Sequence, residues 1–348
     1  MIQVRGLKVN LGSFLLQDIS LDVDEGEYFI ILGPTGAGKT VLLEAIAGLY
    51  PILRGTVSVD GKEITRLKPE KRGIAMVYQE QVLFPHLSVE DNIAFGLRAM
   101  KCPRREIRPR VQGIAEVLGV TELLQRDPTT MSGGEKQKVA LARALVTEPA
   151  VLLLDEPLSA LDPETRERTQ QELVEVHRRL KVTIIHVTHD FEEAIALGHR
   201  VAVLNEGRIA QIGTPEDVLR RPNSEFVANF ALSRNVFSGV IEEGDDDYVQ
   251  VDIGDVRLAT LTGLRGRVHL SLRPEDIFIS REPLKSTARN CFEGAVTSIF
   301  DKGAVLYVTV DVPPAFVCLV TRQAFEELDF TKEDKVWITF KASAIHVF

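Results

Sequence analysis

The stretch Gly33-Pro34-Thr35-Gly36-Ala37-Gly38-Lys39-Thr40 fits the phosphate-loop pattern GxxxxGK[ST] and decides the expected fold. It follows an apolar, β-prone run at residues 28–32 and precedes a helical pattern that stops at Gly48. The glycines let backbone N–H groups turn toward a polyphosphate, and the N-terminus of the helix adds partial positive charge. Lys39 is therefore expected to reach the β- and γ-phosphates, and the Thr40 hydroxyl is expected to bind Mg²⁺.

Length and composition are those of a globular protein with more than one domain. The chain has 348 residues, of which 45% are hydrophobic and 26% charged. No apolar run approaches the roughly 18 residues of a transmembrane helix, so a membrane role would need a separate subunit. A net charge of −9 argues against nucleic acid as the main partner. The cysteines, which suggest neither disulfides nor a zinc site and fit a reducing cytoplasm, are Cys102, Cys291 and Cys318.

Three apolar runs in the chain are each followed by polar side chains. Such runs are typical of parallel strands buried on both faces, and parallel strands end along one edge of a sheet. An α/β fold is predicted, with its polar groups gathered at that edge. The runs and the side chains that follow them are residues 73–78 with Gln79, residues 151–154 with Asp155 and Glu156, and residues 183–188 with His189.

Two smaller regions flank this sheet. Apolar and polar residues alternate near the N-terminus, which predicts a half-exposed antiparallel sheet. Residues 86–150 are predicted to be mostly helical, with a helix at residues 89–100 that starts at Ser88. Pro103 and Pro109 are expected to break the following chain into shorter helices. The alternating segments are residues 2–4, 19–23 and 56–59, with a turn at 60–61.

The first domain is predicted to cover residues 1–232 and to close with a hairpin at 201–212 and a final helix capped at 214–216. Residues 233–348 form a second, β-rich domain that contains a repeat. Its simplest interpretation is two small OB-like barrels. The acidic residues 242–247 are expected to form a solvated hairpin tip. The repeat consists of Arg234, Asn235, Phe237 and Gly239, which recur with the same spacing as Arg289, Asn290, Phe292 and Gly294, and of similar strands at residues 268–279 and 336–347.

The residue types at the predicted edge suit hydrolysis. Asp155 can complete a Mg²⁺ shell opposite Thr40, while Glu156 can orient and deprotonate an attacking water. Ser132-Gly133-Gly134, which opens a helix at residues 136–146, is a second phosphate-binding device. One nucleotide does not need two such devices.

As a whole, the motif set resembles the ATP-binding cassette family over residues 1–232. The resemblance implies an α/β P-loop NTPase fold with a mixed-sheet core, an antiparallel β subdomain and a helical subdomain. It also implies a head-to-tail homodimer, in which the phosphate loop of one subunit and residues 132–134 of the other enclose each ATP. The motifs, in chain order, are the phosphate loop, Gln79, Met131 to Glu135, Val151 to Pro157, Ser159-Ala160-Leu161-Asp162 and Thr188-His189-Asp190.

The resemblance also implies a role for each site residue. Glu156 becomes the catalytic base, His189 the γ-phosphate contact, and Gln79 a metal ligand that couples the site to its partner. The phosphate-binding residues are Gly33 to Thr40 and Ser132, Gly133 and Gly134; the Mg²⁺ ligands are Thr40, Gln79 and Asp155.

Two positions depart from the pattern of the family. Glu135 stands where Gln is commoner, and a carboxylate suits a helix N-terminus but not a nearby phosphate. The aromatic residue that stacks on adenine is not plain, and Leu11 or Phe14 is the candidate.

A single cassette followed by a β-rich repeat resembles the ATPase subunit of importers. Expected partners are two integral membrane permease subunits, with an extracytoplasmic solute-binding protein acting through them, and the expected place is the cytoplasmic face of the cell membrane. Residues 84–87 would lie at the groove that receives a permease helix, although they also fit an ordinary hydrophobic helix entry.

The second domain resembles Mop-type domains that bind molybdate and tungstate. The cargo is therefore expected to be an oxyanion, molybdate or tungstate first and sulfate second, with feedback sensing by this domain. Alternatives are an importer of another solute, a soluble ATPase acting on nucleic acid or ribosomes, an anion sensor, or repeats that only hold the dimer together. In the first repeat Glu275 should repel an anion. The candidate anion ligands are Ser286, Arg289, Asn290, Lys341 and Ser343.

Overall fold

The computed structural model describes residues 1–80, 82–231, 233–241 and 248–348. The chain forms two compact units, Met1–Pro215 and Glu216–Phe348. Helix α8 (Glu225–Phe230) and all of α7 (Pro215–Arg220) except Pro215 therefore belong to the second unit. The helix capped at residues 214–216 is α7, and α8 follows it in the chain. The domain limits 1–232 and 233–348 remain a prediction. The acidic residues Glu242, Glu243, Asp245, Asp246 and Asp247 lie outside the described residues.

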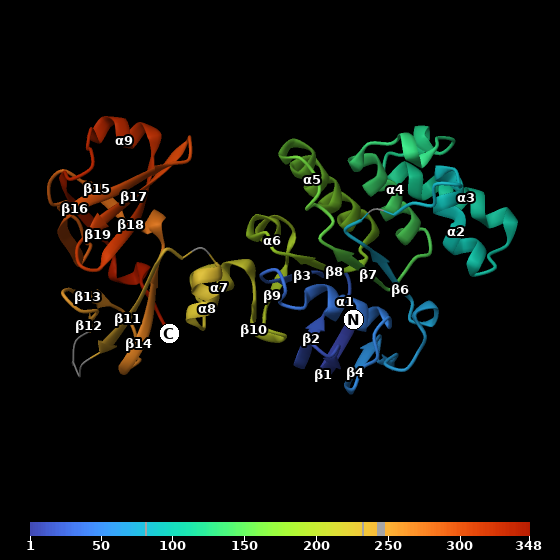
Figure 1. The fold of residues 1–348 in the computed structure, drawn as a ribbon, viewed down its shortest axis with the longest axis horizontal. Coiled ribbons are helices and arrows are strands. Elements are labelled where there is room, and N and C mark those ends of the chain that lie inside the picture. The colour runs from blue at the N-terminus through green and yellow to red at the C-terminus, as the bar shows by residue number, and fades with distance from the viewer. Residues whose placement is uncertain (81, 232, 242–247) are drawn as a thin grey trace. The chain divides into compact units, whose positions relative to one another are not determined.

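A six-stranded sheet lies at the centre of the described first unit, as the apolar runs predict (Figure 1). Its order is β10-β9-β3-β8-β7-β6, and only β10 runs antiparallel to its neighbour. Every residue of β3, β7 and β8 is buried, so these strands have the continuous apolar character of a covered parallel sheet. The bounds are β3 Tyr28–Leu32, β6 Ile74–Val77, β7 Val151–Asp155, β8 Thr183–Thr188, β9 Arg200–Asn205 and β10 Arg208–Gly213.

The predicted antiparallel sheet near the N-terminus is confirmed. Within the described residues its order is β2-β1-β4-β5, and its inward residues share one hydrophobic core with helix α1 and the central sheet. This core fixes α1, and with it the loop before it, against β3 and β7. The bounds are β1 Ile2–Asn10, β2 Leu15–Val23, α1 Lys39–Ala47, β4 Arg54–Val59 and β5 Lys62–Glu63.

Helices α2, α3 and α4 form the predicted helical region and group together beside β6 (Figure 1). The expected break at Pro109 is wrong, because Pro109 lies inside the single helix α3. Val111, Ile114 and Ala115 of α3 are buried, and this packing outweighs the hydrogen bond that proline cannot make. The bounds are α2 Val89–Ala99, α3 Arg104–Val117 and α4 Gly133–Leu145, followed further along the chain by α5 Pro163–Leu180 and α6 Phe191–Leu197.

The second unit is all-β apart from α7, α8, α9 (Arg322–Leu328) and short 3₁₀ turns in its described part. Its two five-stranded sheets are β13-β12-β11-β14-β20 and β15-β19-β16-β17-β18. Strand β20 of the second repeat joins the first sheet, and strand β15 of the first repeat joins the second. The repeats therefore interlock over one core and are not independent barrels. The bounds are β11 Asn235–Ile241, β12 Val249–Asp252, β13 Arg257–Thr260, β14 Gly266–Leu272, β15 Phe278–Ser280, β16 Asn290–Asp301, β17 Val305–Asp311, β18 Ala315–Thr321, β19 Lys335–Phe340 and β20 His346–Val347.

Two buried asparagines at equivalent repeat positions hold the sheets together. Asn235 accepts a hydrogen bond from Val317 N–H at 2.6 Å and donates to the Val317 carbonyl at 2.9 Å. Asn290 accepts from Ala259 N–H at 2.8 Å and donates to the Ala259 carbonyl at 2.9 Å. Each amide therefore reaches from one repeat into the other. The two asparagines thus occupy equivalent positions of the repeat that the sequence indicates and make equivalent bonds.

Candidate nucleotide-binding and catalytic site

The phosphate loop connects β3 to α1 as predicted. Gly36 and Gly38 have φ of 85° and 101°, a left-handed conformation in which glycine alone is unstrained. Lys39 begins α1, is 5% exposed, and donates from Nζ to the carbonyls of Gly33 at 2.8 Å and Pro34 at 3.1 Å. The loop thus curls around the lysine ammonium, leaving its cation inside the turn where phosphates would bind.

Close packing holds the loop from both sides. A Cβ atom at Gly33 would lie 2.4 Å from the Leu204 carbonyl oxygen, and one at Gly38 would lie 2.4 Å from the Phe14 ring. The ring of Phe14 therefore rests against the phosphate loop. Of the two candidates for the adenine contact, Phe14 is the aromatic one and lies beside the loop, although its contact with a base remains a prediction.

Thr40 and Asp155 meet where a magnesium site is predicted. The Thr40 hydroxyl donates to Asp155 Oδ1 at 3.0 Å, which joins α1 to the end of β7. Asp155 is 5% exposed; burial raises the pKa of its carboxyl, against the lowering effect of the Thr40 hydrogen bond. A hydroxyl and a carboxylate fit Mg²⁺, which keeps several waters and binds through few protein oxygens and substrate phosphates. No group of three His, Cys, Asp or Glu side chains that could hold a metal ion occurs among the described residues.

Glu156 lies between His189 and Lys39. Its backbone adopts φ of 42°, and its N–H donates to the Val187 carbonyl at 3.0 Å, so the residue is held where β7 ends beside β8. One carboxylate oxygen lies 3.0 Å from His189 Nδ1, and the other lies 3.5 Å from Lys39 Nζ. Burial lowers the pKa of Lys39, although the Glu156 charge opposes this. A carboxylate between a lysine and a half-exposed histidine is placed to accept a proton from a water at the phosphate end.

Gln79 lies at the same edge of the sheet. It follows β6, whose last residue Val77 pairs with Leu154, directly before Asp155. Gln79 is exposed, as a side chain must be if it is to approach a ligand from solvent.

Residues 132–134 open α4 in a separate place. Ser132 Oγ accepts from Glu135 N–H at 3.3 Å, while Glu135 Oε2 accepts from Ser132 N–H at 2.8 Å. These bonds to Ser132 lower the pKa of Glu135, and Arg126 Nη1 lies 3.9 Å from its other oxygen. The carboxylate that departs from the family pattern thus closes a capping box. Among the described contacts, none joins these residues to Lys39 or Glu156 of the same chain.

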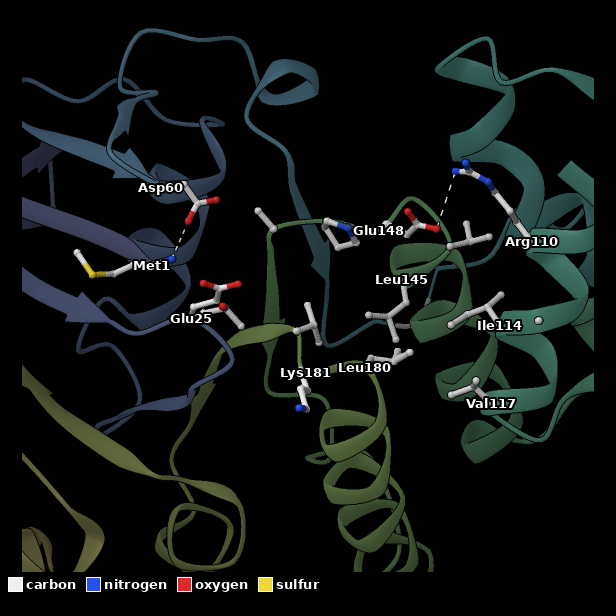
Figure 2. A pocket seen from close by; sticks show the side chains of 16 residues that line it. Met1, Glu25, Asp60, Arg110, Ile114, Val117, Leu145, Glu148, Leu180 and Lys181 are labelled. Atoms are coloured by element: carbon white, nitrogen blue, oxygen red, sulfur yellow. Dashed lines mark hydrogen bonds and ion pairs between the residues drawn. The ribbon is translucent and has the colours of Figure 1, made fainter. Parts of the chain in front are cut away.

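A cavity of about 500 Å³ opens at the opposite edge of the central sheet (Figure 2). Its walls come from α3, from the segments that enter β7 and β8, and from the antiparallel sheet. Arg110 pairs with Glu148 at 4.0 Å across its rim. None of the predicted nucleotide residues lines this cavity, so the chemistry predicted from the motifs lies at the other edge.

Comparison with known proteins agrees with this geometry. The family model described as "ABC transporter" matches residues 16–159, and that of the TOBE domain matches residues 286–347. The chain is 44% identical, over 100% of both chains, to the molybdate/tungstate import ATP-binding protein WtpC of Pyrococcus horikoshii. The chain belongs to the ABC transporter family. As predicted, this ABC protein is the ATPase of an importer and hydrolyses ATP.

Other ABC relatives differ in what their names say they import. The spermidine/putrescine import ATP-binding protein PotA of Thermotoga maritima is 41% identical, over 94% of this chain and 91% of its own. Among solved structures, a dimeric post-hydrolysis ATP-binding cassette bound to ADP and Pi aligns with a TM-score of 0.55 and 28% identity. That alignment covers 62% of this chain and 99% of the other. The ABC cassette fold is thus confirmed.

The sequence patterns missed one buried group near the ABC site. Tyr28, His186 and Glu193 meet in the interior, although they belong to three different elements, β3, β8 and α6. The only available signal was the polar His186 inside an otherwise apolar run. Nothing in the sequence around Tyr28, at the start of a strand, or around Glu193, in a helix, indicated that either side chain would contact His186.

Proposed function

We propose that this chain drives the uptake of an oxyanion, molybdate or tungstate first. The observation that carries the proposal is the match to a molybdate/tungstate import protein over the full length of both chains, the second unit included. Sulfate or another solute, such as spermidine, is the second candidate, because the PotA relatives also match most of the chain.

In this proposal each residue at the edge acts on ATP in a distinct way. Lys39 contacts the β- and γ-phosphates, and Thr40 with Asp155 and Gln79 holds Mg²⁺. Bound Mg²⁺ neutralises charge that develops on the phosphates. Glu156 takes the proton of the attacking water, and His189, 3.0 Å from that carboxylate, contacts the γ-phosphate.

Two copies of the chain are needed for a complete site. Residues 132–134 carry an anion-binding helix start that meets no catalytic residue of its own chain among the described contacts. We infer a head-to-tail homodimer, in which this helix start covers the γ-phosphate bound by the partner copy. Closing the dimer around two ATP molecules and reopening it after hydrolysis would move the permease subunits.

A groove in the first unit suits the permease helix that this function requires. Phe84 and Phe95 line a cavity of about 340 Å³, with ring centroids 4.6 Å apart, and the Arg143 guanidinium lies 5.3 Å from the Phe84 centroid. Phe95 is 46% exposed and Val82 61% exposed. Exposed aromatic and aliphatic surface of this kind marks a binding site for an apolar helix face. The chain would then sit on the cytoplasmic face of the membrane as a peripheral subunit; no helix in its described residues could span a bilayer.

The reconstituted complex of this chain, its permease and the solute-binding protein tests the cargo. Molybdate and tungstate are expected to stimulate ATP hydrolysis, whereas spermidine should not. Phe95→Asp should abolish co-purification with the permease, because a charge in the groove would have to be desolvated. Stimulation by spermidine alone would overturn the choice of an oxyanion.

A cavity in the second unit provides a place for anion sensing. It measures about 500 Å³ and brings together equivalent segments of both repeats, around Arg273 and Lys341. Arg273 pairs with Glu275, and Arg220 lies 4.0 Å from Asp276, which leaves Lys341 without a partner among the described side chains. The repulsive Glu275 is therefore matched by an arginine. The lining residues are Arg220, Arg221, Ser271, Arg273, Glu275, Asp276, Phe278, Lys341, Ser343, Ala344, Ile345 and His346.

The predicted anion ligands thus fall into two groups. Lys341 and Ser343 line the cavity, whereas Ser286, Arg289 and Asn290 do not. The Asn290 amide is bonded to Ala259, and the Arg289 guanidinium lies 5.2 Å from the Tyr248 ring centroid. We propose that an oxyanion bound by Lys341 and Ser343 favours the open dimer and so inhibits the ATPase.

Lys341→Ala is expected to weaken this inhibition. At a coupling of about 1–3 kcal/mol, saturating molybdate should shift dimer closure about 5- to 150-fold in the parent and much less in the variant. Lys335→Ala is the matched control, because Lys335 is exposed and pairs with Glu293 away from the cavity. Equal inhibition of Lys341→Ala and the parent would exclude this cavity as the sensor, and no inhibition of either would leave the repeats as a dimer support.

A further inference from the structure

Three side chains form a buried polar chain beneath the catalytic edge. Tyr28 is 1% exposed, His186 is fully buried and Glu193 is 3% exposed. The Tyr28 hydroxyl lies 2.9 Å from His186 Nδ1, and His186 Nε2 lies 3.4 Å from Glu193 Oε2. Neither His186 Nε2 nor Glu193 Oε2 has a hydrogen-bond partner among the described residues, so their 3.4 Å approach is a polar contact outside hydrogen-bond geometry. These two atoms therefore depend on each other.

The protonation of the chain follows from its surroundings. Burial, together with the Glu193 charge, raises the pKa of Tyr28 well above its ordinary value, so the hydroxyl keeps its proton and donates to His186 Nδ1. A ring that accepts at Nδ1 carries its proton on Nε2, the atom that faces Glu193. Burial raises the pKa of Glu193, but the interactions of its carboxylate with His186, Thr188 and Arg166 together outweigh burial and lower that pKa. Tyr28 and His186 are thus joined by a hydrogen bond, and His186 and Glu193 by a polar contact.

His186 and Glu193 flank His189 in the chain, and Tyr28 joins them from a neighbouring strand. Tyr28 begins β3, the strand that enters the phosphate loop, and His186 lies on β8, which ends just before His189. Glu193 lies in α6, which begins at Phe191, just after His189. The contact between Glu193 and His186 therefore holds α6 against β8. It also fixes the backbone path of the residues between them, His189 included.

The same short segment is held at two further points. Asp190, the N-cap of α6, lies 3.9 Å from Arg166 of α5. Past the end of α6, His199 Nδ1 accepts the Tyr28 backbone N–H at 2.9 Å. Tyr28 is thus bonded on both sides of α6, by its hydroxyl to His186 and by its backbone to His199. The helix that follows His189 is tied to the strand that carries the phosphate loop.

We propose that Glu193 is a positioning residue for ATP hydrolysis, which acts through His186 to hold His189 in register with Glu156 and the phosphate loop. The inference rests on the role proposed above for His189. His189 itself is 52% exposed, and its only described side-chain contact is the 3.0 Å one to Glu156, so its own surroundings do not orient it. The orientation must come from the backbone on either side, which the buried chain controls.

The test compares steady-state kinetics of the full-length chain in its complex. Glu193→Ala is expected to lower kcat about 10- to 100-fold with little change in KM for ATP, because a misplacement near 1 Å costs up to that much in rate. Glu193→Gln keeps an acceptor for His186 and should recover most of kcat. Tyr28→Phe removes only the hydroxyl and should lower kcat less, and it remains informative if Glu193→Ala does not fold. Ile19→Val is the control, a mildly destabilising substitution at a fully buried position of the antiparallel sheet, which should leave kcat unchanged.

A double-mutant cycle separates positioning from a general loss of stability. In a His189→Ala background, Glu193→Ala and Tyr28→Phe should lower kcat no further, since their effects pass through His189. An equal loss in that background, or a parental kcat in both Glu193→Ala and Tyr28→Phe, would overturn the inference. A parental kcat in His189→Ala alone would instead refute the role proposed for His189.

Discussion

Glu156→Gln should leave ATP bound while hydrolysis falls about 10²- to 10⁴-fold, the range for the loss of a general base. The amide keeps the shape of the side chain and its place between His189 and Lys39 but cannot accept the proton of water. ATP binding should survive, because the phosphate loop and Thr40 are unchanged. An ATP-bound dimer should therefore accumulate, which size-exclusion chromatography with ATP and a single-turnover assay would detect.

Two variants make this result specific. Lys39→Ala should weaken ATP binding itself, because it removes the cation inside the loop. Glu164→Gln, in the first turn of α5, removes an exposed acid outside the described site contacts and should hydrolyse ATP at the parental rate. Hydrolysis by Glu156→Gln at the parental rate would show that the base is a different group.

Mixing Ser132→Arg chains with Lys39→Ala chains should restore one of the two ATP sites of the dimer. In a head-to-tail dimer, both lesions of the mixed pair fall in one site, and the other site is built from two unmodified halves. Each homodimer, by contrast, carries a lesion in both sites. Differently tagged chains, purified together, should therefore bind about one ATP per dimer, whereas either homodimer should bind much less than the parent.

This experiment also tests the separation seen in the structure. The Ser132 helix start meets neither Lys39 nor Glu156 within one chain among the described contacts, and we propose that it binds a phosphate held by the partner copy. A mixed dimer with no functional site would contradict the head-to-tail arrangement. Matched mixtures of Lys39→Ala with parental chains set the level expected for one intact site.

The local parts of the site were predictable from the sequence. A phosphate loop is specified by neighbours in the chain: glycines that accept positive φ, and a strand and helix joined by a few residues. Asp155 and His189 follow buried strands, and parallel strands end at one edge, so their meeting with Thr40 and Glu156 could be deduced. Glu135 could likewise be interpreted as a residue suited to a helix start.

Other features depended on partners distant in the sequence. Pro109 lies within α3 because packing of that helix outweighs a local rule. The repeats were visible, but their interlocking was not, because a strand pattern does not say which sheet the strand joins. Similarly, nothing local indicated that Phe14 would rest against Gly38.

By itself, the sequence determined the cassette, the polar edge of its sheet and the repeated pattern of the second unit, since these follow from motifs and periodicities within short segments. Only the tertiary structure decided that Tyr28, His186 and Glu193 form one buried chain, and that Lys341 shares a cavity with Arg273. The physical reason is that a buried polar atom takes whichever partner the packing of distant elements brings within hydrogen-bond reach, and the order of residues along the chain does not encode that choice locally.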